Sequence, residues 1–509
     1  MRKQILITVL TILLFQYINA QAPTAIWQKC YGGSNDDYIA SVAEATSDGG
    51  YVIGIDAQSN DGDVTGNHGG TDVSLMKINS TGIVQWQKCY GGTGEERIIK
   101  LIETNDGGYI ISVITNSNDG DVTGNHGGED LWIFKINAIG TMQWQRCIGG
   151  DGEDYIGDIT ATSDGGYIMC GYTLTINNGD VLGNTSSGGW VVKINDLGVI
   201  QWQKVYDTDS AKSKFSRILQ TSDGGYALAG LTQLESFPGF HGAADALVAK
   251  INQAGTIQWQ KCYGGSGYEE NLRTLIATNN GGYIFSSQTE SNDGDVSGNH
   301  GTSDCWVVKL DASGEILEQN CYGGPGGEGG GYIQKTLDGG MILSVSTAAN
   351  EGVFSDNQGG SDACSIKFSS TGVIQWQKCF GGTGVDGGGI SQLADGTYMV
   401  GGVTNSNNGD ISGNHGVNTF DAFLIKLTAA NLANDSFAIN ITATFPNPIQ
   451  NILHIDLINE LSGKIMDLTG KAIMKVNTKD VDVSSLRAGI YLLDIVSDGK
   501  RYIKKIIKQ

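Results

Sequence analysis

Short runs of aliphatic, β-branched and aromatic residues alternate along the chain with clusters of Gly, Asn, Asp and Ser. The first four runs of the repeating pattern are Tyr38–Thr46, Tyr51–Ala57, Asp72–Asn79 and Gly82–Gly91. Runs of this length and composition predict β-strands, and the glycines between them supply the positive φ angles that tight hairpin turns require. The pattern therefore predicts four-stranded antiparallel sheets.

This four-strand unit occurs seven times. Its most regular marker is the string WQKCYGG, which begins, with some changes, at Trp27, Trp86, Trp144, Trp202, Trp259, Glu318 and Trp376. A second marker, DGGY, also occurs seven times in related forms, and each third run has a lysine near its end, as Lys77 in the first unit. One four-stranded sheet cannot bury both of its faces, whereas seven sheets stacked in a ring can. We therefore expect an all-β fold with a seven-bladed β-propeller over residues 24–430.

The two ends of the repeat region indicate a closed ring. Thr24–Gly32 matches the fourth strand of a unit but has no first three strands before it. The last unit has three strands, ending near Leu427, and lacks a fourth. We therefore expect the N-terminal strand to complete the seventh blade.

The repeats also resemble those of a known group of proteins. Units that combine TSDGGYI, SNDGDVTGNHGG and IQWQKCYGG are similar to the propeller repeats of secreted Bacteroidetes proteins. The resemblance covers about Ala25–Thr428 and implies a secreted propeller, but it implies no single activity.

The composition changes after about Asn431. The segment from Phe437 to Gln509 contains ten Lys or Arg and seven Asp or Glu. Residues 431–444 are predicted to be a linker. Four ordered pieces of the tail resemble the type A C-terminal sorting domain of the type IX secretion system: Phe445–Pro448, Gly463–Lys471, Val481–Ile495 and Lys504–Lys508. The resemblance implies a small immunoglobulin-like β-sandwich over residues 445–509 and the type IX secretion machinery as a partner. It also implies a secreted or cell-surface protein.

The N-terminus is predicted to direct export. Arg2 and Lys3 precede an apolar segment, Ile5–Phe15, which Ala20 follows at the distance of a cleavage site. Residues 1–20 are therefore predicted to be a signal peptide. No later apolar run approaches the roughly 20 residues that a transmembrane helix needs, so no transmembrane segment is expected.

The charge balance bears on partners. The formal net charge is −22, from 32 Lys and Arg against 54 Asp and Glu. Such a chain repels phosphate backbones and anionic lipids and attracts cations. No nucleic-acid ligand is therefore expected.

The long loop between the second and third strands carries the most suggestive chemistry. In four blades it contains the sequence D-[VI]-[TS]-G-N-H, and Asp and Asn oxygens in a glycine-containing loop are ligands that calcium prefers. The candidate calcium ligands are Asp61, Asp63, Asn67, Asp119, Asp121, Asn125, Asp293, Asp295, Asn299, Asp410 and Asn414. The alternative is that these residues only form Asx turns and cap strands. Strand order places these loops and the inter-blade loops on one acidic face, where we expect a ligand to bind.

The nine cysteines leave the disulfide pattern open. Cysteines at equivalent positions of neighbouring blades are expected to lie too far apart to pair. Cys305 with Cys321, and Cys364 with Cys379, fall on paired strands and could form bridges.

No set of residues has the pattern of a catalytic centre. The chain has no Cys–His–Asn pattern or nucleophile elbow, and one histidine per blade cannot converge on a catalytic zinc. The first hypothesis is therefore a surface binding or adhesion module for a glycan or protein ligand. The alternative is an exported hydrolase or lyase acting on polysaccharide in the propeller channel, which requires acids found in single blades, such as Glu235, Glu351 and Asp356.

Overall fold

The computed structural model of the chain describes residues 22–429, 444–445 and 448–509, with gaps at 44–45, 47–48, 208–211, 351–353, 355, 456–460, 468–470 and 498–499. Every regular element in these ranges is a β-strand. Among them there is accordingly no helix that is long and apolar enough to cross a membrane. The predicted signal peptide and residues 431–443 of the predicted linker lie outside the described residues.

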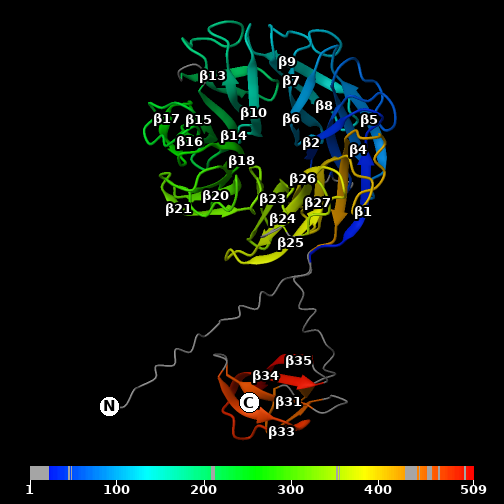
Figure 1. The fold of residues 1–509 in the computed structure, drawn as a ribbon, viewed down its shortest axis with the longest axis vertical. Coiled ribbons are helices and arrows are strands. Elements are labelled where there is room, and N and C mark those ends of the chain that lie inside the picture. Colours follow the sequence, from blue (N-terminus) through cyan, green and yellow to red (C-terminus); the bar gives the residue numbers. More distant parts are fainter. Residues whose placement is uncertain are drawn as a thin grey trace. The chain divides into compact units, whose positions relative to one another are not determined.

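Seven four-stranded antiparallel sheets surround a common axis (Figure 1). The strands of blades 1 to 3 are β2 (Asp37–Ala43), β3 (Tyr51–Ala57), β4 (Asp72–Ile78), β5 (Val84–Tyr90), β6 (Glu96–Glu103), β7 (Tyr109–Thr115), β8 (Asp130–Ile136), β9 (Met142–Ile148), β10 (Asp154–Ala161), β11 (Tyr167–Thr173), β12 (Gly188–Ile194) and β13 (Ile200–Asp207). Those of blades 4 and 5 are β14 (Ser213–Gln220), β15 (Tyr226–Thr232), β16 (Asp245–Ile251), β17 (Ile257–Tyr263), β18 (Glu269–Ala277), β19 (Tyr283–Thr289), β20 (Asp304–Leu310) and β21 (Ile316–Tyr322). Blades 6 and 7 contain β22 (Tyr332–Lys335), β23 (Met341–Thr347), β24 (Asp362–Phe368), β25 (Ile374–Phe380), β26 (Asp386–Gln392), β27 (Tyr398–Thr404), β28 (Asp421–Leu427) and β1 (Ala25–Tyr31).

The ring is closed by the N-terminal strand, as predicted. β1 pairs antiparallel with β28, from Trp27 opposite Lys426 to Tyr31 opposite Ala422. One hydrophobic cluster joins blade 1 to blade 7, with Ile53 and Met76 on one side and Met399 and Leu424 on the other. The first and last blades therefore cover each other's apolar faces.

The repeated markers contribute to the contacts between and within blades. The fourth-strand residues Trp86 and Tyr90 cover the last hairpin of the next blade, where the Tyr90 hydroxyl donates a hydrogen bond to the Gly140 carbonyl, 2.5 Å away. Gly140 has a φ of 74°, and a Cβ there would lie 3.0 Å from the Tyr90 hydroxyl. Only glycine meets both conditions without strain.

The DGGY aspartate and the third-strand lysine form an ion pair within blades 2, 3, 4 and 6. Lys193, almost fully buried, forms an ion pair with Asp164 at 3.0 Å and also donates to the Ile194 carbonyl and the Gln201 side chain. The same lysine–aspartate pair recurs in other blades, as Lys135–Asp106, Lys250–Asp223 and Lys367–Asp338. A buried lysine charge is thus partnered, as its desolvation requires.

Cysteine pairing differs between blades 5 and 6. Cys364 and Cys379 lie directly opposite each other on β24 and β25 and form a disulfide. In blade 5 Cys305 is opposite Tyr322, one residue out of register with Cys321, and both cysteines are free. Because successive side chains of a strand point to opposite faces, this offset separates the two sulfurs.

The chain divides into two compact units between Ala429 and Ala430. The second unit contains one sheet of β29 (Thr444–Phe445), β30 (Ile452–Ile455) and β33 (Asp480–Asp482) and a second of β32 (Ala472–Val476), β31 (Ser462–Met466), β34 (Gly489–Ser497) and β35 (Lys500–Lys508). Leu453, Ile465, Val481, Leu493 and Ile506 belong to one buried cluster between the two sheets. This arrangement agrees with the predicted small β-sandwich.

Candidate functional site

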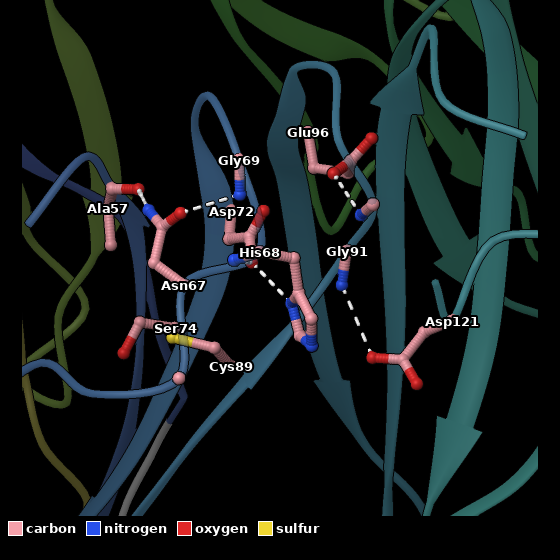
Figure 2. Close-up of polar contacts among 12 residues, drawn as sticks. Ala57, Asn67, His68, Gly69, Asp72, Ser74, Cys89, Gly91, Glu96 and Asp121 are labelled. Carbon is pink, nitrogen blue, oxygen red and sulfur yellow. Dashed lines mark hydrogen bonds and ion pairs between the residues drawn. The ribbon is translucent and has the colours of Figure 1, made fainter. Parts of the chain in front are cut away.

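The predicted calcium loops are held by hydrogen bonds to backbone groups of the same loop, of the preceding strand and of the neighbouring inter-blade loop. In blade 1 the Asp61 carboxylate accepts from the Ser34 amide at 2.8 Å, and the Asn67 side chain donates to the Ala57 carbonyl at 2.9 Å. Figure 2 shows that the Asn67 oxygen also accepts from the Gly69 amide. The bond between Asn67 and Gly69 is that of an Asx turn, whereas the bond between Asp61 and Ser34 joins two neighbouring loops.

The other predicted ligands repeat this arrangement in part. Asp119 and Asp293 accept backbone amides as Asp61 does, and Asn125, Asn299 and Asn414 donate to carbonyls as Asn67 does. Asp121 and Asp295 accept from the amides of Gly91 and Gly264 at 3.3 Å, and Asp410 accepts from the Gln358 side chain. Asp63 lies 3.6 Å from Nε2 of His415 in the preceding blade.

Nδ1 of each loop histidine contacts the aspartate that begins the third strand of the same blade. His68 Nδ1 lies 2.6 Å from Oδ2 of Asp72, the first residue of β4 (Figure 2). The same contact occurs in the pairs His126–Asp130, His241–Asp245, His300–Asp304 and His415–Asp421. Within the described ranges, no three or more His, Cys, Asp or Glu side chains gather in a group that could hold a metal ion.

Each of six blade junctions also contains two buried carboxylates. A Cβ on Gly91 would lie 2.6 Å from Asp72 Oδ1 and 2.5 Å from Oε2 of Glu96, which begins the next blade. Glu96 accepts a hydrogen bond from the Gly92 amide, whereas Asp72 Oδ1 is buried without a hydrogen-bond partner. Burial raises the pKa of the equivalent Asp130 and of Asp362 to about 6. These carboxylates belong to the blade interfaces.

A hollow lies among the innermost strands, where the hydrolase or lyase alternative expects a channel. These strands, such as β6, β10, β14 and β18, surround the axis of the ring in Figure 1. Two hollows, of about 470 and 910 Å³, share residues Ile39, Asn271, Arg273 and Tyr332 among others. Together they form what we call the central channel.

The central channel is basic, although the protein is strongly acidic. Its lining includes Lys100, Lys214, Arg217 and Arg273, and no Asp or Glu is among the described residues that line it. Two of these cations have structural partners. Lys100 forms an ion pair with Asp158 at 2.8 Å, and the Arg217 guanidinium donates to backbone carbonyls of blades 3, 4 and 5.

The other two cations lie beside tyrosine rings. Lys214 Nζ is 4.3 Å from the centre of the Tyr172 ring, which stacks on Tyr155 with 5.4 Å between ring centres. The Arg273 guanidinium is 5.8 Å from the centre of the Tyr332 ring, which is 47% exposed. Neither Lys214 nor Arg273 has an ion-pair partner among the described residues.

Glycines widen one side of the central channel. The first strands of the other blades carry side chains at the channel wall, but blades 6 and 7 present Gly329, Gly330 and Gly387 to Gly389 there. A Cβ at Gly389 would have no neighbour closer than 3.7 Å, and at Gly329 none within 4 Å. The larger hollow therefore opens next to Tyr332.

The acids required by the hydrolase alternative lie elsewhere or outside the described residues. Glu235 is an exposed loop residue between β15 and β16, and Asp356 accepts from the Cys379 amide. Neither lines the central channel, and Glu351 lies outside the described ranges.

The sequence predicted ligand binding on the acidic loop face and a propeller channel only for the hydrolase or lyase alternative; the cations that line the channel were not predicted. The channel cations stand on first strands, but they occupy single blades and so do not appear in any repeated marker. A signal was present: Lys100, Arg217 and Arg273 lie four residues after the acid or serine that begins their first strand. Aligning the seven first strands would have placed them on the inner wall.

Comparison with known proteins identifies the tail. Residues 443–509 match the secretion system C-terminal sorting domain, which confirms the predicted sorting domain. No curated protein matches the chain. The chain is therefore a secreted or cell-surface protein with a propeller outside the cell.

Solved structures that resemble the chain have low sequence identity. A structure of BBS1N in complex with ARL6DN aligns with a TM-score of 0.46 and 9% identity, over 81% of this chain and 98% of that chain. The Pan2 WD40 domain of Neurospora crassa gives 0.42 and 10%, over 79% and 98%. A europium-containing methanol dehydrogenase gives 0.38 and 10%, over 81% and 95%. The propeller assignment rests on the strand pairing described above.

Proposed function

We propose that the chain is an exported binding protein that holds an extracellular glycan or protein ligand in the central channel. The observation that carries this proposal is a hollow with unpaired cations beside tyrosines in a protein of net charge −22. Concave sites with a few convergent polar groups and aromatic walls are typical of ligand binding. The sorting domain supports an extracellular place of action.

A glycan and protein array with three forms of the protein tests this proposal. Gly389→Trp fills the hollow without backbone strain, since a Cβ there has open space and the φ is not positive. Gly326→Trp is the matched control, because Gly326 lies in an inter-blade loop of the acidic face with similar free space. We expect Gly389→Trp to abolish binding and Gly326→Trp to retain it.

The opposite pattern, with binding lost only in Gly326→Trp, would move the site to the loop face. The same array eluates should be assayed for new reducing ends or double bonds. Turnover of a bound polysaccharide would favour the hydrolase or lyase, which stays the alternative.

We also retain calcium binding by the loops as a proposal. Carboxylate oxygens of Asp63, Asp121 and Asp295 lie on the acidic face and have at most long contacts to protein groups. Calcium binding to the folded state would raise the melting temperature. An equal melting temperature in chelator and in millimolar calcium would exclude it.

A further inference from the structure

We infer that the ligand of the central channel is an acidic saccharide, whose anionic groups bind Lys214 and Arg273 while a sugar ring lies against the exposed Tyr332. This inference rests on the proposed function and specifies the chemistry of the same site. It differs from the expectation for an acidic protein, which would attract cations.

The charge of the hollow selects for anions. All charged residues on the described lining are cationic, and the lining belongs to a concave region where low-dielectric walls focus the field. A neutral ligand would form no ion pairs with these cations, and a cationic ligand would be repelled by them. The channel therefore favours an anion over the rest of the acidic surface.

Among the described residues that line the channel, two cations are free to bind an anion. Lys100 is already paired with Asp158, and Arg217 already donates to backbone carbonyls of neighbouring blades, so their loss would disturb the contacts between blades. The side chains of Lys214 and Arg273 are exposed and lie beside tyrosine rings. The Arg273 backbone carbonyl also accepts a hydrogen bond from Arg217. Both line the 470 Å³ hollow, and Arg273 also lines the larger one.

The tyrosines favour a saccharide over an acidic peptide. A uronic acid or sulfated sugar presents a flat C–H face and an anionic group on one rigid ring, and so can use a tyrosine and an adjacent cation together. An acidic peptide side chain would bind the cation but would make no use of the tyrosine ring. Arg273 with the exposed Tyr332 provides this combination. The Tyr172 ring is already stacked on Tyr155 and lies under Lys214, so that pair contributes the lysine charge. The glycine wall of blades 6 and 7 leaves room for a chain of sugars beside Tyr332.

Titration calorimetry with four probes tests the inference on the mature protein: an oligogalacturonate, a sulfated oligosaccharide, a neutral cello-oligosaccharide and a poly-glutamate peptide. We expect at least one acidic saccharide to bind, with affinity that falls as salt rises from 50 to 500 mM because salt screens the charges. The neutral saccharide and the peptide should bind at least about tenfold more weakly.

Single-charge variants locate the contact. Lys214→Gln and Arg273→Gln should each lower affinity for the acidic saccharide about tenfold or more, with melting temperatures unchanged within a few degrees. The charge-matched control is Lys29→Gln, since Lys29 is exposed on β1, the outermost strand of blade 7. It should bind as the unsubstituted protein does.

The other outcomes distinguish a failure of the acidic-saccharide inference from a failure of the proposed function. If the neutral saccharide binds equally well and Gly389→Trp still abolishes binding, the anionic class is wrong and the proposed function stands. Tighter binding of poly-glutamate than of any saccharide would replace the saccharide by a peptide. If no probe binds and Gly389→Trp changes nothing on the array, the inference and the proposed function fail together.

Discussion

Asp362, the first residue of β24, is fully buried, and only one of its carboxylate oxygens has a hydrogen-bond partner. Oδ2 accepts from the Gln358 amide at 2.7 Å, and Oδ1 is unpaired. Burial, with a further contribution from the nearby Asp386 carboxylate, raises the pKa of Asp362 to about 6. The folded protein therefore binds a proton at Asp362 more tightly than the unfolded chain does, although the carboxyl is ionised above about pH 6.

The sign of its pH dependence follows from linkage. A carboxyl whose pKa is higher in the folded than in the unfolded protein stabilises the fold at low pH and loses this contribution as pH rises through about 6. Asp362→Asn imitates the protonated group at every pH. We expect it to raise the free energy of unfolding at pH 7.5 by roughly 1–3 kcal/mol and to have little effect at pH 4. Thermal melts from pH 4 to 8 measure this difference.

Asp164→Asn is the control of opposite sign. The hydrogen bond from Thr162 and the ion pair with Lys193 lower the pKa of Asp164 to about 2, so its charge stabilises the fold above that pH. This variant should be less stable than the unsubstituted protein at pH 7.5. If both variants shift stability in the same direction at pH 7.5, the assignment of a raised pKa to Asp362 is wrong.

The sequence predicted where the residues of the repeated markers lie in each blade, but it did not predict which residues they contact. The position of each loop histidine and of each third-strand aspartate follows from the repeat, yet their contact depends on how the loop returns to the strand. The Lys193–Asp164 pair joins the turn between β10 and β11 to the end of β12, 29 residues away in sequence. Sequence spacing alone does not specify such contacts.

At the scale of elements, β1 is the one strand whose blade is not continuous in sequence. Thr24 and Thr428 are hydrogen-bonded through the Thr428 amide and the Thr24 carbonyl, 2.8 Å apart. A chain that begins at residue 34 and carries residues 24–33 after Thr428, joined by an Asn-Gly turn, should therefore restore blade 7 as a hairpin. We expect its melting temperature to lie within a few degrees of the parent propeller.

The matching deletion lacks residues 24–33 altogether. It leaves β28 as an unpaired edge and removes Trp27 and Tyr31 from the junction with blade 1. Its melting temperature should fall by more than about 10 °C, or the protein should aggregate, because an exposed edge templates further pairing. Equal stability of the deletion and the rearranged chain would argue against closure by β1.

The disulfide of blade 6 provides a second test at this scale. Cys364 and Cys379, 15 residues apart, join β24 to the outermost strand β25. Chain-entropy arguments give such a bridge up to about 3 kcal/mol. We expect a reductant to lower the melting temperature of the parent protein but not that of the double variant Cys364→Ala, Cys379→Ala. Cys305→Ala, which removes a free thiol, should remain sensitive to the reductant.

Most elements were predictable because they repeat. Seven copies of one pattern gave the strands, their order and the closure of the ring, since each copy samples the same blade. The innermost strands are the exception. They differ most between blades, as Gly329–Gly331 and Gly387–Gly389 show, and the channel depends on these differences. An analysis of repeated positions therefore cannot detect a site that is formed by residues found in single blades.

At the scale of the whole molecule, the propeller and the sorting domain are separate compact units with separate cores. A domain with its own buried cluster can fold without its neighbour. Export and binding should therefore be separable by truncation. This independence gives the last prediction.

Removal of residues 443–509 should leave a folded propeller that stays in the periplasm, whereas the same residues fused to a periplasmic reporter should carry it to the surface or medium. The physical reason is that recognition requires only the folded sandwich, whose core includes the fully buried Leu493. Leu493→Asp buries a charge in that core and should block export as the truncation does. Lys475→Gln, an exposed change on β32, should not. Immunoblots of periplasm, outer membrane and medium measure the distribution. Export of the Leu493→Asp protein at the normal level would show that a linear signal, and not the folded domain, is recognised.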